Sequence, residues 1–214
     1  MQLHFYQSLS GKNLIYEYIN KLPNDEQVDG LSVLENIEND EFDKITIKRW
    51  QKKVYEVYFK KHNRMFFVTV DGSDTYILHA CRKQKNKTEK KDSKIIIKRA
   101  KELGEILGKK IYIGGEKMAF VKGNVSEIIE EKRQNDPEFK KIRDESREEY
   151  RLIGEMIKIR KKERITQSKL ANLIGSKQQV VSRIEKHESI PSLQFFCKML
   201  DSLGYEIQIT KKTI

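Results

Sequence analysis

Cysteine is scarce in this chain of 214 residues, where only Cys81 and Cys197 occur. The two lie far apart in the sequence, and neither belongs to a spacing such as Cys-x-x-Cys that zinc sites use. A cysteine-held metal and a disulfide framework are therefore excluded. We expect two free, buried thiols in a reducing cytosol.

Long apolar runs are missing as well. No run approaches the roughly 18 residues that a membrane span needs. The first 13 residues lack the basic region and apolar stretch of a secretory signal, so we expect a cytoplasmic protein with no membrane segment. Hydrophobic residues make up 37% and charged residues 35%, which indicates a globular chain with much surface.

Acidic residues are outnumbered in two long blocks of the sequence. Residues 44–113 hold 20 basic and 7 acidic residues, and residues 151–214 hold 13 basic and 6 acidic residues. Between them, residues 114–150 hold 8 basic and 10 acidic residues. Two polyanion-binding surfaces would produce this pattern, as would a generally basic surface. The lysine-rich tract CRKQKNKTEKK at 81–91 likewise either binds a polyanion or is a solvated loop.

The first part of the chain is expected to be an α+β domain with two helices and a twisted antiparallel sheet. Ser10 or Asn13 begins the first helix, Pro23 ends it, and Asn24 or Asp25 caps the second. Runs of β-branched and aromatic residues, separated by turn signals, then predict a three-stranded meander. The expected elements are a short strand at 3–6, meander strands at 52–60, 64–70 and 75–83, and a helix at 92–107.

The best candidate for a domain boundary is Gly114-Gly115. It ends the stretch KKIYIGG, which is either a last strand or the exit from the first domain. Beyond it the chain is highly charged and helix-prone, with a break at Asp136-Pro137. The expected division is a first domain at 1–113, a helical connector at 114–150 and an all-α domain at 151–214. Near the end, YEIQIT has the composition of a strand.

The strongest pattern in the sequence lies between Ile165 and Gly204. Thr166 predicts the N-cap of a short helix, Gly175 a turn with positive φ, and Ser176 the cap of a second short helix. Two short helices joined by a glycine turn form a helix-turn-helix, whose second helix enters the major groove of DNA. The apolar residues expected to face inward are Leu170, Ala171, Ile174, Val180, Val181 and Ile184.

The outward side of the second helix carries residue types that read bases. Glutamine can pair bidentately with adenine, and lysine and arginine contact guanine or phosphate. His187, in the turn that follows, is expected at the surface without a role. The residues expected to face outward are Lys177, Gln178, Gln179, Ser182 and Arg183.

Residues 151–210 resemble the XRE-type repressors of phages and bacteria. The resemblance rests on Thr166-Gln167, Leu170-Ala171, Gly175, Ser182-Arg183-Ile184-Glu185, Pro191-Ser192-Leu193 and Leu203-Gly204. It implies a homodimer on a pseudo-palindromic operator, with a phosphate contact from Gln167 and bases read by the second helix. The implied DNA-binding residues are Gln167, Ser176, Lys177, Gln178, Gln179, Ser182 and Arg183.

Residues 1–110 resemble the phage-derived HigB branch of the RelE superfamily, small toxins that cut mRNA on the ribosome. The shared features are Glu56, Arg64, the Asp71-Gly72 turn, Leu78-His79, Arg82-Lys83 and Ala100 after Lys98-Arg99. The chain departs from the family at three places. Tyr58 stands where an arginine is common, Cys81 where an aromatic residue is common, and Thr88-Glu89 where Thr-Pro is common.

This second resemblance implies a metal-independent endoribonuclease without a cofactor, in which the RNA 2′-hydroxyl attacks the adjacent phosphate. Arginine and lysine would stabilise the negative charge that develops on phosphorus, and histidine or tyrosine would carry a proton. No carboxylates and histidines gather at metal-ligand spacing in this region, so no metal is expected. The implied catalytic residues are Arg64, Arg82, Lys83, His79 and Tyr58, and the implied RNA-binding residues are Lys85, Lys87 and Lys90.

In HigB–HigA systems the toxin precedes an XRE-type antitoxin, and here that order occurs within one chain. The sequence therefore predicts a toxin–antitoxin fusion that binds operator DNA through 151–214 and, if active, mRNA on the ribosome through 44–113. Acidic residues of 125–150 would lie against the basic face of the toxin part and neutralise it. The alternative is a transcriptional regulator only, with an inactive toxin-like domain used for dimerisation or sensing, which Tyr58 favours.

Overall fold

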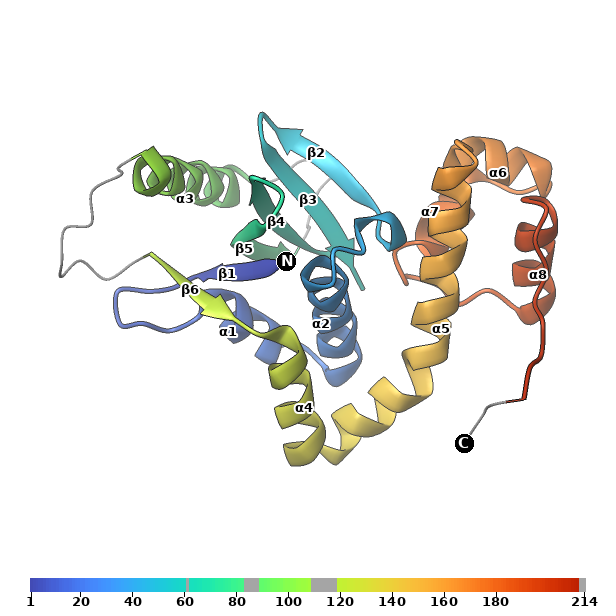
Figure 1. Ribbon diagram of the computed structural model, residues 1–214, viewed down its shortest axis with the longest axis horizontal. Coiled ribbons are helices and arrows are strands. Elements are labelled where there is room, and N and C mark those ends of the chain that lie inside the picture. The colour runs from blue at the N-terminus through green and yellow to red at the C-terminus, as the bar shows by residue number, and fades with distance from the viewer. Residues whose placement is uncertain (61, 83–88, 109–118, 212–214) are drawn as a thin grey trace.

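The structure of the chain is a computed structural model that describes residues 1–60, 62–82, 89–108 and 119–211 (Figure 1). A sheet with helices on both faces forms the N-terminal part, and helices alone form the C-terminal part. The expected α+β class, followed by a helical domain, is confirmed. None of the helices in the described ranges is long and apolar enough to cross a membrane.

Six strands form one mixed sheet in the order β2-β3-β4-β5-β1-β6. The expected meander is confirmed as β3, β4 and β5, which run antiparallel. β1 pairs in parallel with β5 and antiparallel with β6, so two distant segments extend the meander. The strands are β1 Gln2–Tyr6, β2 Ile47–Gln51, β3 Val54–Phe59, β4 Asn63–Val70, β5 Asp74–Arg82 and β6 Phe120–Gly123.

The helices begin and end largely where the sequence predicts. The side chain of Asn13 caps the first helix by accepting a hydrogen bond from the backbone of Ile15 at 3.0 Å. The N-cap of the second helix is Pro23, so the prediction of Asn24 or Asp25 is wrong. The helices are α1 Leu14–Asn20, α2 Asn24–Glu38, α3 Lys90–Gly108, α4 Val125–Asn135, α5 Pro137–Lys162, α6 Gln167–Leu173, α7 Gln178–Ile184 and α8 Leu193–Asp201, with a 3-10 turn η1 at Phe42–Lys44.

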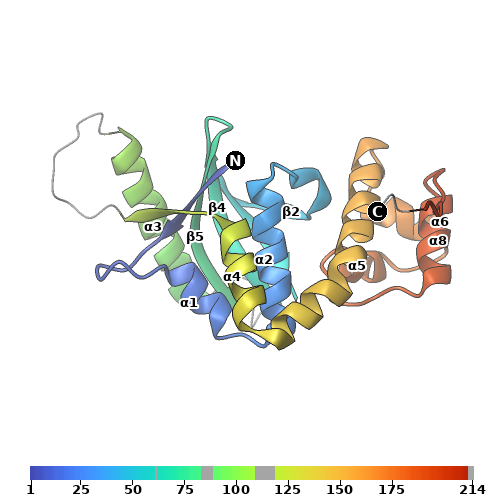
Figure 2. The ribbon, with the colours of Figure 1, turned by 60° about the horizontal axis from the view of Figure 1, so that its bottom comes forward.

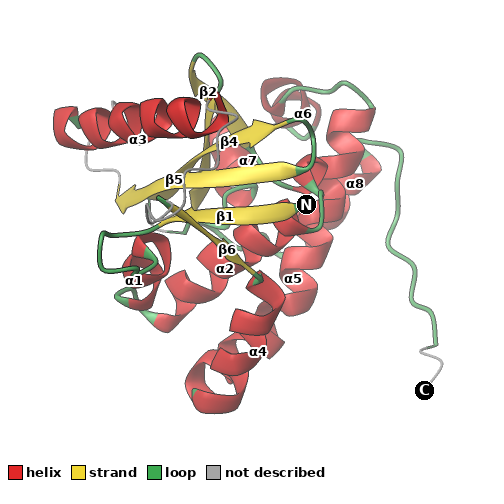
Figure 3. Cartoon of the chain, turned by 60° about the vertical axis from the view of Figure 1, so that its left-hand side comes forward, coloured by secondary structure: helices red, strands yellow, loops and turns green. Residues whose placement is uncertain are grey.

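Side chains alternate between the two faces of the sheet and pack into a separate cluster on each face. Helices α1 and α2 lie on one face of the sheet and α3 lies on the other (Figure 3). Phe5 and Phe67 pack with residues of α1 and α2, and Phe66 packs with residues of α3. α2 lies very close to the sheet at Gly30, where a Cβ would stand 2.9 Å from the ring of Phe59. Only glycine permits this approach without a shift of the ring.

The long helix α5 runs from the N-terminal part to the C-terminal helices (Figure 2) and contributes to two hydrophobic cores. Its first half buries Phe139 in the core between the sheet and α2. Its second half buries Ile153, Met156 and Ile157 in the core of the C-terminal helices. The helix is continuous over 26 residues, so it joins the two parts without a flexible linker.

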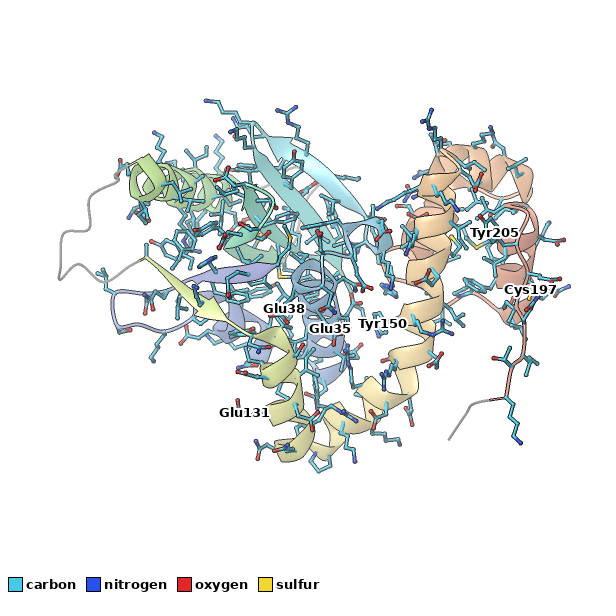
Figure 4. All side chains as sticks on the ribbon, in the orientation of Figure 1. Glu35, Glu38, Glu131, Tyr150, Cys197 and Tyr205 are labelled. Atoms are coloured by element: carbon cyan, nitrogen blue, oxygen red, sulfur yellow. The ribbon has the colours of Figure 1, made fainter. Side chains whose placement is uncertain are left out.

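The N-terminal packing unit extends past the expected boundary. β6 completes the sheet, and Glu38 of α2 anchors the start of α4 by accepting hydrogen bonds from the backbone N–H groups of Val125 at 2.8 Å and Ser126 at 3.2 Å (Figure 4). The stretch KKIYIGG, with Gly114-Gly115, lies outside the described residues. The division of the chain at that point therefore stays a prediction.

Two smaller expectations for the C-terminal part are wrong. YEIQIT at 205–210 is not a strand, because no neighbouring strand supplies hydrogen bonds to its backbone. Cys197 is exposed on α8, whereas Cys81 on β5 is buried as expected.

Shortening Phe139 should test whether α5 completes the N-terminal core. Replacing this fully buried ring with alanine leaves a cavity, so Phe139→Ala should lower the free energy of unfolding by about 3–5 kcal/mol. Urea denaturation followed by circular dichroism measures the change. Lys140→Ala, at the exposed neighbouring position, should change it by less than about 0.5 kcal/mol. Equal effects of the two substitutions would contradict the packing.

Candidate nucleic-acid interfaces

Tyr58 and Arg64, two of the implied catalytic residues, are register partners on β3 and β4 and face α3's side of the sheet. Arg64 is only 1% exposed, and its guanidinium lies 3.6 Å from the carboxylate of Glu56. The Tyr58 hydroxyl donates to the same carboxylate at 3.1 Å. Burial raises the pKa of Tyr58 to about 12, so the phenol keeps its proton. This trio is an internal ion-pair network rather than an open phosphate site.

His79 shares this face of the sheet and is held in one tautomer. Its Nδ1 lies 3.2 Å from a guanidinium nitrogen of Arg99, which can only donate, so Nδ1 accepts. Its Nε2 therefore carries the hydrogen and donates to Asp92 of α3 at 2.9 Å. Burial lowers the pKa of His79, so the imidazole is neutral at physiological pH. A neutral, fixed imidazole can relay a proton only if Asp92 or Arg99 moves.

Three potential metal ligands come together here, although the sequence predicts no such group. The ligand atoms of His79, Cys81 and Asp92 lie within 4.8 Å of one another. Burial raises the pKa of the Cys81 thiol to about 12, which opposes the thiolate that a metal binds. Arg99 beside the histidine adds a positive charge that would repel a cation. The donor set is therefore a poor fit for a metal.

Arg82 lies on the other face of the sheet from Arg64. It pairs across the meander with Asn63, the neighbour of Arg64, and its guanidinium lies 3.3 Å from Glu26 of α2. The structure thus brings Tyr58, Arg64 and His79 to one face and separates Arg82 from them. Lys90 is exposed at the start of α3, whereas Lys83, Lys85 and Lys87 lie outside the described residues.

The two short helices of the C-terminal part have the expected geometry. Thr166 caps α6 by accepting a hydrogen bond from the backbone of Lys169 at 3.1 Å, and Gly175 has a φ of 65° in the turn. The capping prediction for Ser176 is wrong, because α7 starts after Lys177 and has no side-chain cap. Val180 is 37% exposed, so it points outward instead of into the core. The inward residues confirmed by burial are Leu170, Ala171, Ile174, Val181 and Ile184.

The implied DNA-binding residues form a polar surface around the start of α7. Lys177, Gln178, Gln179 and Arg183 are exposed. Ser176, Ser182 and Gln167 are partly buried at the edge of the same surface. The side-chain amide of Gln178 donates to the side-chain oxygen of Gln167 at 2.8 Å, which links the phosphate candidate to the base-reading candidate.

Behind this surface lies a buried carboxylate, Glu185, which belongs to the quoted motif but was given no role from the sequence. Glu185 accepts two hydrogen bonds from Arg160 of α5, at 2.6 and 2.8 Å, and one from Gln167 at 2.8 Å. Its Oε2 also accepts from the hydroxyl of Thr46 at 3.0 Å. Thr46 precedes β2, so a polar chain runs from the N-terminal sheet to Gln178. Both charged residues fall on the inward stripe of their helices, Arg160 three positions after Ile157 and Glu185 four positions after Val181, and this is the signal that could have identified them.

The turn after α7 packs against the N-terminal part. The Lys186 ammonium lies 4.8 Å from the ring centre of Tyr58, and His62 lies 3.6 Å from Glu188. The ring of His187 contacts the ring of Tyr150 of α5, with 4.2 Å between the ring centres and 31° between the ring planes. Figure 4 labels Tyr150 on α5. His187 is therefore a contact between the two parts, and the prediction of a surface position without a role is wrong.

A second set of contacts ties α5 to the segment before β2. The ammonium of Lys161 donates to the carbonyl oxygens of Phe42 at 3.0 Å and Ile45 at 2.6 Å. Lys44 lies 3.1 Å from Glu155. Among the described acidic residues of 125–150, Glu149 interacts electrostatically with Lys60, which follows β3. α4 packs against α2, and its Glu130 pairs with Arg133 of the same helix.

Two parts of the chain match known protein families. Residues 17–101 match the family described as phage derived protein Gp49-like, and residues 156–209 match a helix-turn-helix family. The chain thus has a Gp49-like toxin domain of the RelE and HigB type followed by an XRE-type helix-turn-helix domain. This order is consistent with a fused toxin–antitoxin, and the pair of domains indicates a regulator of the toxin–antitoxin type. A search of curated proteins gave no match.

Two buried groups at the contact between the parts should give opposite pH dependences. Burial raises the pKa of Asp29, which accepts a hydrogen bond from the backbone N–H of Lys60, from 3.8 to about 7, and lowers the pKa of His187 from 6.5 to about 3. Between pH 3.8 and about pH 7, Asp29 is protonated in the folded chain and loses its proton on unfolding, so its contribution to stability falls as pH rises. His187 gains a proton on unfolding, so its contribution rises with pH.

The two slopes oppose each other between about pH 4.5 and 6.5, and single substitutions should expose them. Asp29→Asn should make the free energy of unfolding rise with pH across this window, and His187→Gln should make it fall. Urea denaturation at several pH values measures both slopes. Parallel curves for the two variants and the parent chain would contradict the assignment.

Proposed function

We propose that the chain is a toxin–antitoxin fusion in which the C-terminal part restrains an mRNA interferase-like domain and represses its own operon. Residues 1–113 would act on ribosome-bound mRNA, and 151–214 would bind a pseudo-palindromic operator as a homodimer. The observation that carries the proposal is the docking of the turn after α7 on the strand that holds Tyr58. Lys186 of that turn lies over the ring of this candidate catalytic residue.

Covalent linkage makes such restraint easy to maintain. Surface ion pairs such as Lys44 with Glu155 contribute only about 0–1 kcal/mol each. Within one chain, however, the partner is present at an effective concentration on the order of millimolar. The partly buried hydrogen bonds from Lys161 and the ring contact between His187 and Tyr150 add to this, so the docked state needs no tight intermolecular affinity.

A second function is favoured by the burial of Arg64. A residue that is 1% exposed and bound to Glu56 does not reach an RNA phosphate without rearrangement. Tyr58 also replaces the arginine common in the toxin family. The alternative is therefore a DNA-binding regulator whose toxin-like domain has lost its activity. Both proposals include binding of operator DNA by residues 151–214. They differ in whether the N-terminal domain, once released from the C-terminal part, cuts RNA.

Loosening the docked state within the whole chain tests the toxin proposal. Lys161→Glu places a carboxylate against the carbonyl oxygens of Phe42 and Ile45, so the two parts should separate. The variant should arrest bacterial growth and cleave mRNA in a translation extract. Adding Arg82→Gln should relieve the arrest by at least about tenfold in viable count if Arg82 contacts phosphate.

Lys162→Glu is the matched control, because it makes the same charge change at the exposed neighbouring residue. This variant should grow normally. Normal growth with soluble, folded Lys161→Glu protein would instead support the regulator without toxin activity.

Removing the base-reading amides tests the DNA-binding role. Gln178→Ala combined with Gln179→Ala should weaken binding to the chain's own upstream DNA by about 1–3 kcal/mol per lost amide–adenine pair. Binding to unrelated DNA should stay nearly unchanged, because phosphate contacts supply it. Fluorescence anisotropy at several salt concentrations measures both affinities.

Lys177→Ala provides the contrasting variant. It should weaken binding to all sequences and reduce the salt slope by about 1. If the double glutamine variant lost affinity equally on every sequence, the start of α7 would not be the base-reading surface.

A further inference from the structure

A cavity of about 520 Å³ lies between α3, the β2–β3 hairpin and the end of β4, on the opposite face of the sheet from α1 and α2. Small-molecule sites in proteins commonly have volumes of about 300–1,000 Å³. Neither the toxin-like chemistry nor the DNA-binding surface uses these residues. The apolar side chains that line the cavity include Trp50, Val54, Val68, Ile97, Leu103 and Leu107.

The cavity is open because the helix presents small residues to it. Gly104 and Ala100 lie on the lining side of α3, and a Cβ added at Gly104 would meet nothing within 4 Å. Glycine inside a helix lowers helix stability by about 1 kcal/mol relative to alanine. Gly104 therefore weakens α3 slightly while it leaves space in the cavity. Ile97 and Leu107 remain 40% and 44% exposed beside this space, which leaves apolar surface for a ligand to cover.

The rim of the cavity is positively charged. Lys52, Lys53 and Lys101 line it, against one carboxylate, Asp71. Among the described residues, none of these three ammonium groups pairs with a carboxylate within 4.0 Å. The backbone carbonyl of Lys52 accepts from Arg49 Nε at 2.6 Å, which fixes the hairpin corner that carries two of the lysines. An apolar interior with a cationic rim is complementary to an amphipathic anion.

We propose that this cavity binds a small organic acid with an aliphatic or aromatic body and one carboxylate. The body would pack on Trp50, Leu103 and the open helix surface at Gly104, and the carboxylate would lie at the rim beside Lys53 and Lys101. A nucleic-acid strand fits less well, since its charges lie along the backbone and its bases need an open stacking surface. The toxin-like domain would thereby also be a ligand-binding domain, whichever of the two proposed functions holds.

The experiment uses the only tryptophan of the chain as its reporter. Trp50 lines the cavity, so titration of the full chain with sodium decanoate should give a saturable change in tryptophan emission. Decanol, which has the same chain length and no charge, should bind about fivefold or more weakly, because one ion contact at a surface is worth about 1 kcal/mol. Lys53→Gln combined with Lys101→Gln should remove that difference between decanoate and decanol.

Blocking the cavity supplies the decisive variant. Gly104→Phe should fill the open space and weaken decanoate binding by at least about tenfold, while helix content stays the same by circular dichroism. Gly108→Phe is the matched control, because Gly108 also has open space around it and does not line the cavity. The control should bind as the parent chain does. Equal binding by the parent and both phenylalanine variants, or equal binding of decanol and decanoate by the parent chain, would overturn the proposal.

Discussion

The carboxylate of Glu185 is the interaction on which the arrangement of this chain depends. Taking a carboxylate out of water costs several kcal/mol, and only close, well-directed donors offset that cost. Arg160 supplies two of them, and Gln167 and Thr46 supply the others. These donors come from α5, from α6 and from the segment before β2. One buried charge thus fixes α7 against the long helix, orients the glutamine at the DNA surface and reaches the N-terminal sheet.

Because α5 is one continuous helix that packs in both hydrophobic cores, it holds the N-terminal and C-terminal parts close together. Phe139 lies in one core and Met156 in the other, and the helix is continuous between them, through Gly154. Individually weak contacts, such as the ion pair of Lys44 with Glu155, then act between parts that are already held close. Association between separate proteins would instead carry a large cost in translational and rotational freedom.

The sequence was most informative where the decisive interactions are local. The β-branched runs of β3 to β5, the Asn13 and Thr166 caps and the turn at Gly175 could all be predicted, because each depends on residues within a few positions. β2 and β6 were not predicted, since both are short edge strands whose pairing partners decide their structure. The position of His187 depended on Tyr150 of another element, and the burial of Arg64 on its pairing with Glu56 across the sheet. Such pairings between distant elements leave no periodic signal in one sequence.

The charge pattern suggested that acidic residues of the connector neutralise a basic face, but the contacts point to a different mechanism of restraint. α4 packs on α2, and the ammonium of Lys186, from the C-terminal part, lies over the ring of Tyr58. An aromatic ring is a natural stacking surface for an unpaired RNA base, and a cation over the ring occupies that surface. On the proposed function, restraint would then act by covering the ring rather than by cancelling charge. The surrounding lysines would remain cationic, so the chain would keep its general affinity for polyanions while the candidate site is closed.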